Sequence, residues 1–162
     1  MKNKGFSLVE LIIVIAIMAI LAAAIAPALI RYIDKSRRSD DVASAETINT
    51  ATQAALANEE AYDEIQPAMD PSKTVTLAKA TCGSAFSNTG SGVSNSAKTF
   101  ISEINSSCGG ASPKLKYKKG FNSKKPDTWV IGVNEAGKPV VWLGSGAATQ
   151  WELQPDICKE YK

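Results

Sequence analysis

Hydrophobic and polar residues follow three successive patterns along this chain. The first is an apolar run, because residues 11–30 contain no charged side chain. A run of about 18 or more apolar residues can cross the roughly 30 Å hydrocarbon core of a bilayer as a helix. The pattern therefore predicts a membrane-spanning helix over residues 6–30.

The second pattern is that of an amphipathic helix over residues 31–62. Apolar and small residues recur there every three or four positions, which places them on one helix face; they are Val42, Ala45, Ile48, Thr52, Ala55 and Leu56. We expect one continuous helix from Phe6 to about Tyr62, ending before Gln66–Pro67 because the residue before proline disfavours helical geometry. Pro27 predicts either a kink or a local break in it.

The third pattern is a series of short β-prone segments separated by turn residues. Four segments qualify as strands, at residues 114–118, 128–133, 139–143 and 149–153. Consecutive short strands favour an antiparallel sheet, here over about 114–154, with one face on the amphipathic helix. Residues 70–108 are rich in Ser, Thr, Gly and Asn and predict a connecting loop with a short helix at about 95–107. The fold class is therefore α+β, with residues 63–162 as a globular head.

Glu10 is the exceptional residue of the apolar segment. An ionised carboxylate inside lipid costs a few kcal/mol, and such residues are usually paired. No Lys or Arg lies within one helical turn of Glu10 on its own chain. Cleavage between Gly5 and Phe6 would create a positive α-amine four residues before Glu10, and the amine of a neighbouring copy could then neutralise the carboxylate.

Residues 5–11 read Gly-Phe-Ser-Leu-Val-Glu-Leu, between a leader that contains Lys2 and Lys4 and an apolar helix that reaches Pro27. This arrangement resembles the prepilin signature of type IV pilins and pseudopilins, over about the first 35 residues. The resemblance implies that a prepilin peptidase removes residues 1–5, that Phe6 is N-methylated, and that Glu10 meets the Phe6 amine of an adjacent subunit. It also implies the type IV pilin fold, a long N-terminal helix packed against a C-terminal antiparallel sheet.

The same resemblance implies a structural subunit, a major pilin, that polymerises into an extracellular type IV pilus for adhesion, twitching motility or surface colonisation. Before assembly it would be a single-pass membrane protein with its head outside the cytoplasm. The implied partners are other copies of the chain, the prepilin peptidase, an inner-membrane assembly platform with its ATPase, and minor pilins. A pseudopilin or minor pilin of a type II secretion or DNA-uptake apparatus is the alternative within the family.

Two other interpretations of the N-terminus stay open. A secretory signal peptide could end at the small residues Ala22 to Ala24, and a plain signal anchor could hold Glu10 near the hydrated interface. Charge counting does not assign an orientation, because Lys2 and Lys4 compete with the basic residues that follow the span. Only the family resemblance places the leader in the cytoplasm.

A dense charged cluster follows the apolar segment at residues 31–41. We expect a solvated belt with pairs Asp34–Arg38 and Arg37–Asp41 along the helix, or pairs between subunits. Removal of Lys2 and Lys4 from the 18 basic residues would leave 16, equal to the 16 acidic ones. A mature chain of zero formal charge suits dense packing of many copies.

Six lysines crowd the segment before the second strand candidate, with Tyr117 and Phe121 between them; they are Lys114, Lys116, Lys118, Lys119, Lys124 and Lys125. We interpret this run as the wet face of an edge strand, where lysine discourages unwanted pairing. The alternatives are a contact with acidic residues of a neighbouring copy, such as Glu59, Glu60, Asp63 and Glu64, and the binding of a polyanion such as nucleic acid. The latter would make the chain a membrane-anchored polyanion-binding protein.

Cys82, Cys108 and Cys158 predict one disulfide in a domain outside the cytoplasm. The favoured pair is Cys82–Cys108, followed by Cys108–Cys158. A metal site would need all three thiolates and a fourth ligand. The chain has no histidine, which excludes Ser-His and Cys-His catalysis, and its Gly-Ser-Gly segments match no phosphate-binding fingerprint. We therefore expect no enzyme activity, metal or cofactor.

Overall fold

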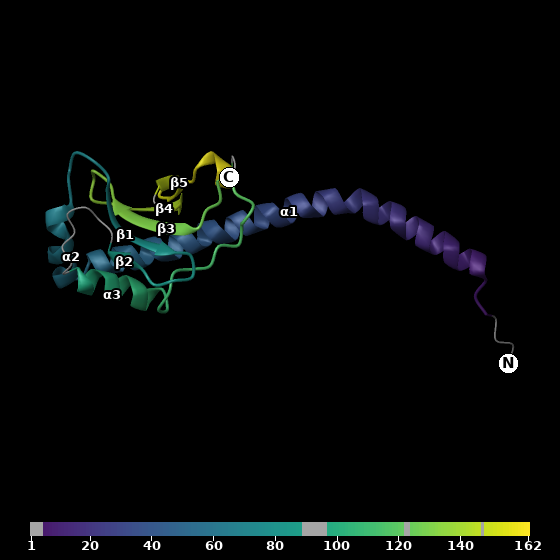
Figure 1. Ribbon diagram of the computed structural model, residues 1–162, viewed down its shortest axis with the longest axis horizontal. Coiled ribbons are helices and arrows are strands. Elements are labelled where there is room, and N and C mark those ends of the chain that lie inside the picture. Colours follow the sequence, from purple (N-terminus) through teal and green to yellow (C-terminus); the bar gives the residue numbers. More distant parts are fainter. Residues whose placement is uncertain (1–4, 89–96, 122–123, 147) are drawn as a thin grey trace. The chain divides into compact units, whose positions relative to one another are not determined.

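The computed structural model describes residues 5–88, 97–121, 124–146 and 148–162. It comprises two units, one up to Ser36 and the other from Arg37 to Lys162. Helix α1 (Leu8–Leu56) contributes to both, and its ribbon runs unbroken through Pro27 (Figure 1). The local break that Pro27 allowed is therefore absent from this structure. The greater part of the leader, residues 1–4, lies outside the described residues.

The long helix ends earlier than expected. α1 stops at Leu56 and a second helix, α2 (Glu59–Ile65), follows after a short interruption, so the prediction of one helix to Tyr62 is wrong. Asn58 causes the interruption: its backbone is extended, and its side-chain oxygen accepts hydrogen bonds from the N–H groups of Glu60 and Ala61 at 3.1 and 3.3 Å. Such an N-cap starts a new helix. The end before Gln66–Pro67 is confirmed, because α2 gives way there to the 3-10 helix η1 (Gln66–Ala68).

The head contains a five-stranded antiparallel sheet in the order β2-β1-β3-β4-β5. The strands are β1 (Val75–Thr81), β2 (Ser87–Asn88), β3 (Thr128–Val133), β4 (Pro139–Ser145) and β5 (Ala148–Gln154). The last three match strand candidates of the sequence. α3 (Lys98–Ser107) lies where a short helix was expected, and the 3-10 helix η2 (Lys159–Tyr161) comes near the C-terminus.

The sheet differs from the predicted one at two places. β1 and β2 fall within residues 70–108, which we expected to be a connecting loop with a short helix. β1 has backbone partners on both sides, since it pairs with β2 and β3, and these partners stabilise a strand that its serine-rich and glycine-rich surroundings concealed. Residues 114–118, in contrast, are not a strand, because their backbone is bound to α1 as described below.

The core of the head lies between the sheet and one face of α1. The buried positions on that face include Ala45, Ile48, Thr52 and Ala55, as the amphipathic pattern predicts. They meet large side chains from the sheet and α3, among them Trp129 and Phe100, both fully buried. Gly132 lets two strands and a tryptophan approach closely, because a Cβ there would collide with the Val75 carbonyl oxygen and the Trp142 ring.

Candidate functional site

The N-terminal half of α1 is an apolar surface without cover in the isolated chain. Every residue from Gly5 to Ile33 is exposed, and Phe6 and Ile20 expose 85% and 71% of their surfaces. α1 is long and apolar enough to cross a membrane, with a mean hydropathy of 3.0 over its most apolar 18 residues. A contiguous apolar surface of this kind marks a contact with lipid or with other protein.

Glu10 lies at the start of this surface and is itself exposed. Its Oε2 atom accepts a hydrogen bond of 2.9 Å from the Ser7 N–H, while the Ser7 carbonyl accepts one from the Leu11 N–H. This is half of a capping box, which satisfies a backbone donor at the helix start. No ion pair with Glu10 occurs among the described residues.

Asp41 lies near the start of the part of α1 that belongs to the head, and it is fully buried. Its two carboxylate oxygens accept hydrogen bonds from the backbone N–H groups of Lys116 and Tyr117, at 2.7 and 3.0 Å. Burial raises the pKa of Asp41 above its ordinary value, although these hydrogen bonds partly oppose the increase. The predicted exposed pair Arg37–Asp41 is therefore wrong. Asp41 instead binds the helix to the lysine-rich loop, by which we mean the described residues 114–121 and 124–125. This contact explains why residues 114–118 do not join the sheet.

A cluster of aromatic residues lies next to the contact between Asp41 and Tyr117. The ring centroids of Tyr117 and Tyr161 lie 5.1 and 5.3 Å from that of Phe121, and Trp151 lies 5.5 Å from Phe121. The Arg38 guanidinium lies 5.3 Å from the centroid of the Tyr117 ring, and its Nη1 donates to the Glu160 carbonyl at 2.9 Å. This aromatic clasp joins α1, the lysine-rich loop, β5 and the C-terminus. The clasp was not predicted from the sequence, because only the interleaved Tyr117 and Phe121 indicated it.

The three cysteines are separate thiols, each partly buried. Neither of the pairings we favoured, Cys82–Cys108 or Cys108–Cys158, is formed, and a disulfide stays a prediction. Burial raises the pKa of all three thiols, that of Cys82 to about 12. Thiolates are therefore scarce at neutral pH, and it is the thiolate that reacts or binds metal. The described residues contain no group of three or more His, Cys, Asp or Glu that could hold a metal ion.

The acidic residues of α2 separate into two roles. Glu64 accepts hydrogen bonds from the N–H groups of Thr99 and Phe100 at 3.2 and 3.0 Å, which caps α3. Burial raises the pKa of Glu64, but these hydrogen bonds outweigh it and the net change is a decrease. Glu59, Glu60 and Asp63 are exposed. Of the four acidic residues that we considered for contacts between copies, Glu64 is thus already engaged within its own head.

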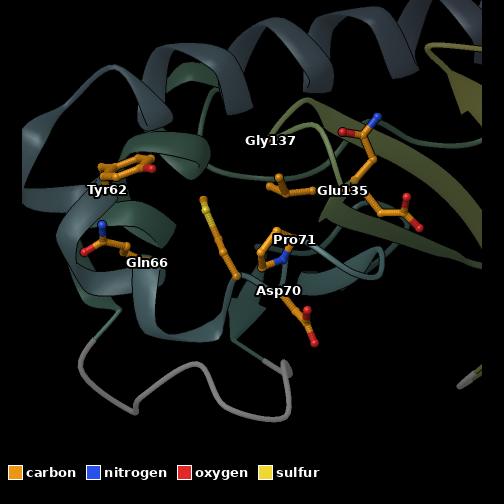
Figure 2. A pocket seen from close by; sticks show the side chains of 9 residues that line it. Tyr62, Gln66, Asp70, Pro71, Glu135 and Gly137 are labelled. Carbon is orange, nitrogen blue, oxygen red and sulfur yellow. The ribbon is translucent and has the colours of Figure 1, made fainter.

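A small cavity of about 250 Å³ lies next to α2. Figure 2 shows Tyr62 and Gln66 on one side of it and Asp70, Pro71, Glu135 and Gly137 on the other. Asp70 is bound to its own turn through the N–H and hydroxyl of Ser72 and to the Lys73 ammonium at 3.2 Å. The Asp70 carboxylate therefore already has its partners within its own turn, and it adds no functional group to the candidate site.

The six lysines of the lysine-rich loop are all exposed. They belong to the segment that Asp41 and the aromatic clasp hold, and not to an edge strand as we expected. The only pairing in this part of the described chain is an isolated bridge between Phe121 and Lys124. The loop runs past the C-terminal end of the head, away from α2, as the green segment of Figure 1. The lysines therefore gather on a loop that is remote from the acidic residues of α2.

Comparison with known proteins gives three results. The profile of the family described as the prokaryotic N-terminal methylation motif matches residues 1–26. Fimbrial protein Q of Moraxella bovis is 32% identical over 163 aligned residues, covering 98% of this chain and 98% of that protein. Type IV major pilin protein PilA of Myxococcus xanthus (strain DK1622) is 33% identical over 63 residues, which is 39% of this chain and 29% of that protein. No solved structure matches the chain.

Proposed function

Because this chain belongs to the type IV pilin family, which is structural and not enzymatic, we propose that it is a major pilin that polymerises into a pilus filament. The observation that carries the proposal is the exposed apolar half of α1 together with Glu10, which makes no ion pair among the described residues. Similarity along the whole chain to a fimbrial protein favours a major pilin over a pseudopilin or minor pilin. Adhesion, twitching motility and surface colonisation are the roles such a filament would serve.

The proposed assembly begins with cleavage between Gly5 and Phe6 and N-methylation of Phe6. The methylation motif covers both residues. The chain is then a membrane-anchored subunit that becomes part of an extracellular pilus. Prepilin peptidase would act first, and an inner-membrane platform with its ATPase, together with minor pilins, would act in extrusion.

Packing of residues 6–30 from many copies would form the interior of the filament. Lipid covers the exposed apolar side chains before assembly, so burying them against protein gains little from the hydrophobic effect itself. Close packing supplies the gain instead, and small residues at a helix surface permit it. Ala22, Ala23 and Ala24 lie on this exposed stretch and leave room for a neighbouring helix.

Glu10 would set the register of neighbouring copies. In the apolar interior its carboxylate needs a cation, and the Phe6 amine that processing creates is the proposed partner. Removing one member of a buried ion pair costs about 3–5 kcal/mol, because the other charge remains buried. The Ser7 N–H already orients the carboxylate. Any arrangement of neighbouring copies that does not bring an amine to Glu10 thus carries the free-energy cost of an unpaired buried carboxylate.

Pro27 gives α1 a place where helical structure can be lost. Proline has no N–H, so the Ala23 carbonyl lacks the usual donor four residues on. α1 is continuous there in the isolated chain. We propose that the stretch just before Pro27 is where α1 unwinds during entry into the filament, as the family resemblance implies.

The test is mass spectrometry of the native N-terminus together with a Glu10→Ala strain. We expect the mass of a chain that starts at N-methylated Phe6, and loss of filaments in the variant with the head still folded. Glu46→Ala is the matched control, because Glu46 is an exposed glutamate on the same helix, and it should leave filaments unchanged. An intact Met1 would reject the prepilin assignment, and normal filaments from Glu10→Ala would reject the role of Glu10.

A further inference from the structure

Two hollows adjoin at the end of β1, on the side of the head that carries the lysine-rich loop. One measures about 630 Å³ and the other about 530 Å³, and they share Thr81 and Asp127 in their walls. Lys114, Lys118 and Lys125 line the first and Lys79 lines the second. We call the two hollows together the lysine groove. Neither the family's motif nor the filament proposal assigns a role to it.

The charge of this groove is strongly one-sided. Four lysines line it, whereas Asp127 is the one acidic residue among the described residues of its walls. Asp127 is already engaged, because its Oδ1 accepts hydrogen bonds from the Thr128 hydroxyl at 2.7 Å and the Gly146 N–H at 2.9 Å. Four lysines against one carboxylate leave an excess of positive charge around a concave surface, which attracts anions.

The wall around Gly83 is held in place by the protein's own hydrogen bonds. The Ser112 hydroxyl accepts from the Gly83 N–H at 3.1 Å and donates to the Thr81 carbonyl at 3.2 Å, and the Ser112 N–H donates to the Ser84 carbonyl at 2.9 Å. The Lys114 stem lies along Gly83, where a Cβ would stand 3.3 Å from the Lys114 Cγ. A preformed site binds with less loss of conformational entropy than one that must be ordered.

The groove's other side chains indicate the kind of anion. Its walls offer the hydroxyls of Thr81, Ser84 and Ser87, which suit the hydroxyl groups of a sugar. No aromatic side chain lines it among the described residues, because Tyr117 and Phe121 are used in the aromatic clasp. Unpaired nucleic acid is held largely by stacking of bases on aromatic rings, and the groove lacks such a platform.

We propose that the lysine groove binds an acidic polysaccharide, a sugar polymer that bears carboxylate or sulfate groups. Ammonium groups would pair with the acidic groups, and the wall hydroxyls would contact the sugars. A linear polyanion releases condensed counterions when lysines neutralise it, so affinity falls as salt rises. The groove requires no filament, since all its residues belong to one head.

The experiment measures binding of the full chain, purified in detergent and not assembled, to heparin as a sulfated probe and polygalacturonate as a carboxylated one. The groove variant is the triple substitution Lys114→Gln, Lys118→Gln and Lys125→Gln. The matched control removes the same charge elsewhere through Lys98→Gln, Lys138→Gln and Lys159→Gln, three exposed lysines that do not line the groove. We expect the groove variant to weaken binding about tenfold or more and to reduce the salt dependence by about one unit of slope per lysine removed. The control should change affinity less than about twofold.

A second variant tests shape separately from charge. Thr81→Trp should obstruct the groove where its two hollows meet, keep all four lysines, and weaken binding of both probes, with an unchanged thermal melt as evidence of folding. Equal losses of affinity in the groove variant and the control variant would overturn the proposal. So would binding of neutral dextran as tight as that of the acidic probes, or failure of the chain to bind heparin and polygalacturonate. Equal or tighter binding of oligothymidine through the same lysines would identify a nucleic-acid groove instead. Because the chain is unassembled, failure here is distinct from failure to form filaments.

Discussion

The two halves of α1 belong to one helix but differ in burial. From Gly5 to Ile33 every residue is exposed, whereas beyond Arg37 the helix buries Ala45, Ile48 and Thr52 against the head. The first half is more apolar and yet its described residues are all exposed. Burial is therefore set by what the rest of the chain supplies, and not by the hydrophobicity of the helix alone. The head completes its own core, while the N-terminal half is left for lipid or other copies.

The acidic residues of the two halves show the same difference. Asp41 is buried with a backbone N–H on each carboxylate oxygen. Glu10 is exposed and has the Ser7 N–H as its one hydrogen-bond donor among the described residues. Asp41 is thus satisfied inside its own molecule, whereas we propose that the charge of Glu10 is neutralised by another molecule.

The largest effect should come from a cavity placed in the half of α1 that belongs to the head. Ile48→Ala should lower the free energy of unfolding of the head by about 2–5 kcal/mol, because it removes fully buried methyl groups. Ile17→Ala is the matched change in the first half, where Ile17 is 52% exposed, and it should leave the head's stability unchanged. Chemical denaturation of the full chain in detergent, followed by tryptophan fluorescence, measures both. Equal effects would contradict the division.

Asp41→Ala should have the next largest effect. It leaves the N–H groups of Lys116 and Tyr117 without acceptors in a buried place, and an unsatisfied buried group costs about 1–3 kcal/mol. We expect a loss of about 2–4 kcal/mol for the pair, together with faster hydrogen exchange at these two amides. Asp40→Ala, at an exposed neighbouring position, serves as the control. Undiminished protection of the two amides would show that Asp41 does not fix the loop.

Removal of the α3 cap should cost less. Glu64→Ala deprives the N–H groups of Thr99 and Phe100 of their acceptor, and loss of a helix cap typically costs about 1 kcal/mol. Glu60→Ala, an exposed residue on the same helix, should have a smaller effect. Thermal melts of the two variants compare them directly, and equal shifts would argue against the cap.

The smallest effect concerns pH. The pKa of Asp41 is raised in the folded head, so the folded state retains this proton more readily than the unfolded state. Its contribution to stability is complete below the ordinary pKa of 3.8 and is lost as pH rises through the folded value. Asp41→Asn should remove this slope, which denaturation at a series of pH values would reveal. A slope identical in both proteins would contradict the raised pKa.

Local patterns predicted the elements whose surroundings they describe. The amphipathic face of α1 follows from periodicity, because it buries one regular face. Strands β3 to β5 follow instead from β-prone residues between turns, and β3 is buried at every position. The strand β1 and the irregular course of residues 114–118 did not follow, since each depends on pairing or hydrogen bonds with a distant segment. The break at Asn58 was missed although its capping hydrogen bonds with Glu60 and Ala61 are local. Alternation at residues 114–118 looked like a strand, but their donors meet a carboxylate 75 or more positions away.

The candidate site divides in the same way. Glu10 is recognisable because a charge is conspicuous in an apolar run, and the methylation motif covers it. The aromatic clasp and the lysine groove could not be read from the sequence, because they combine residues from β1, the lysine-rich loop and the C-terminus. Asp41 was hidden among the exposed charges of residues 31–41, and only its tertiary partners distinguish it.

We propose that the Glu10 carboxylate is neutralised by the Phe6 amine of an adjacent copy. The most direct test is a density map of the native filament that resolves Glu10 and the N-terminus of mature Phe6. We predict a carboxylate oxygen of Glu10 within about 4 Å of the Phe6 amine of an adjacent copy, which is the distance of an ion pair. A Glu10 that faces solvent or lipid, with every amine far from it, would contradict the account.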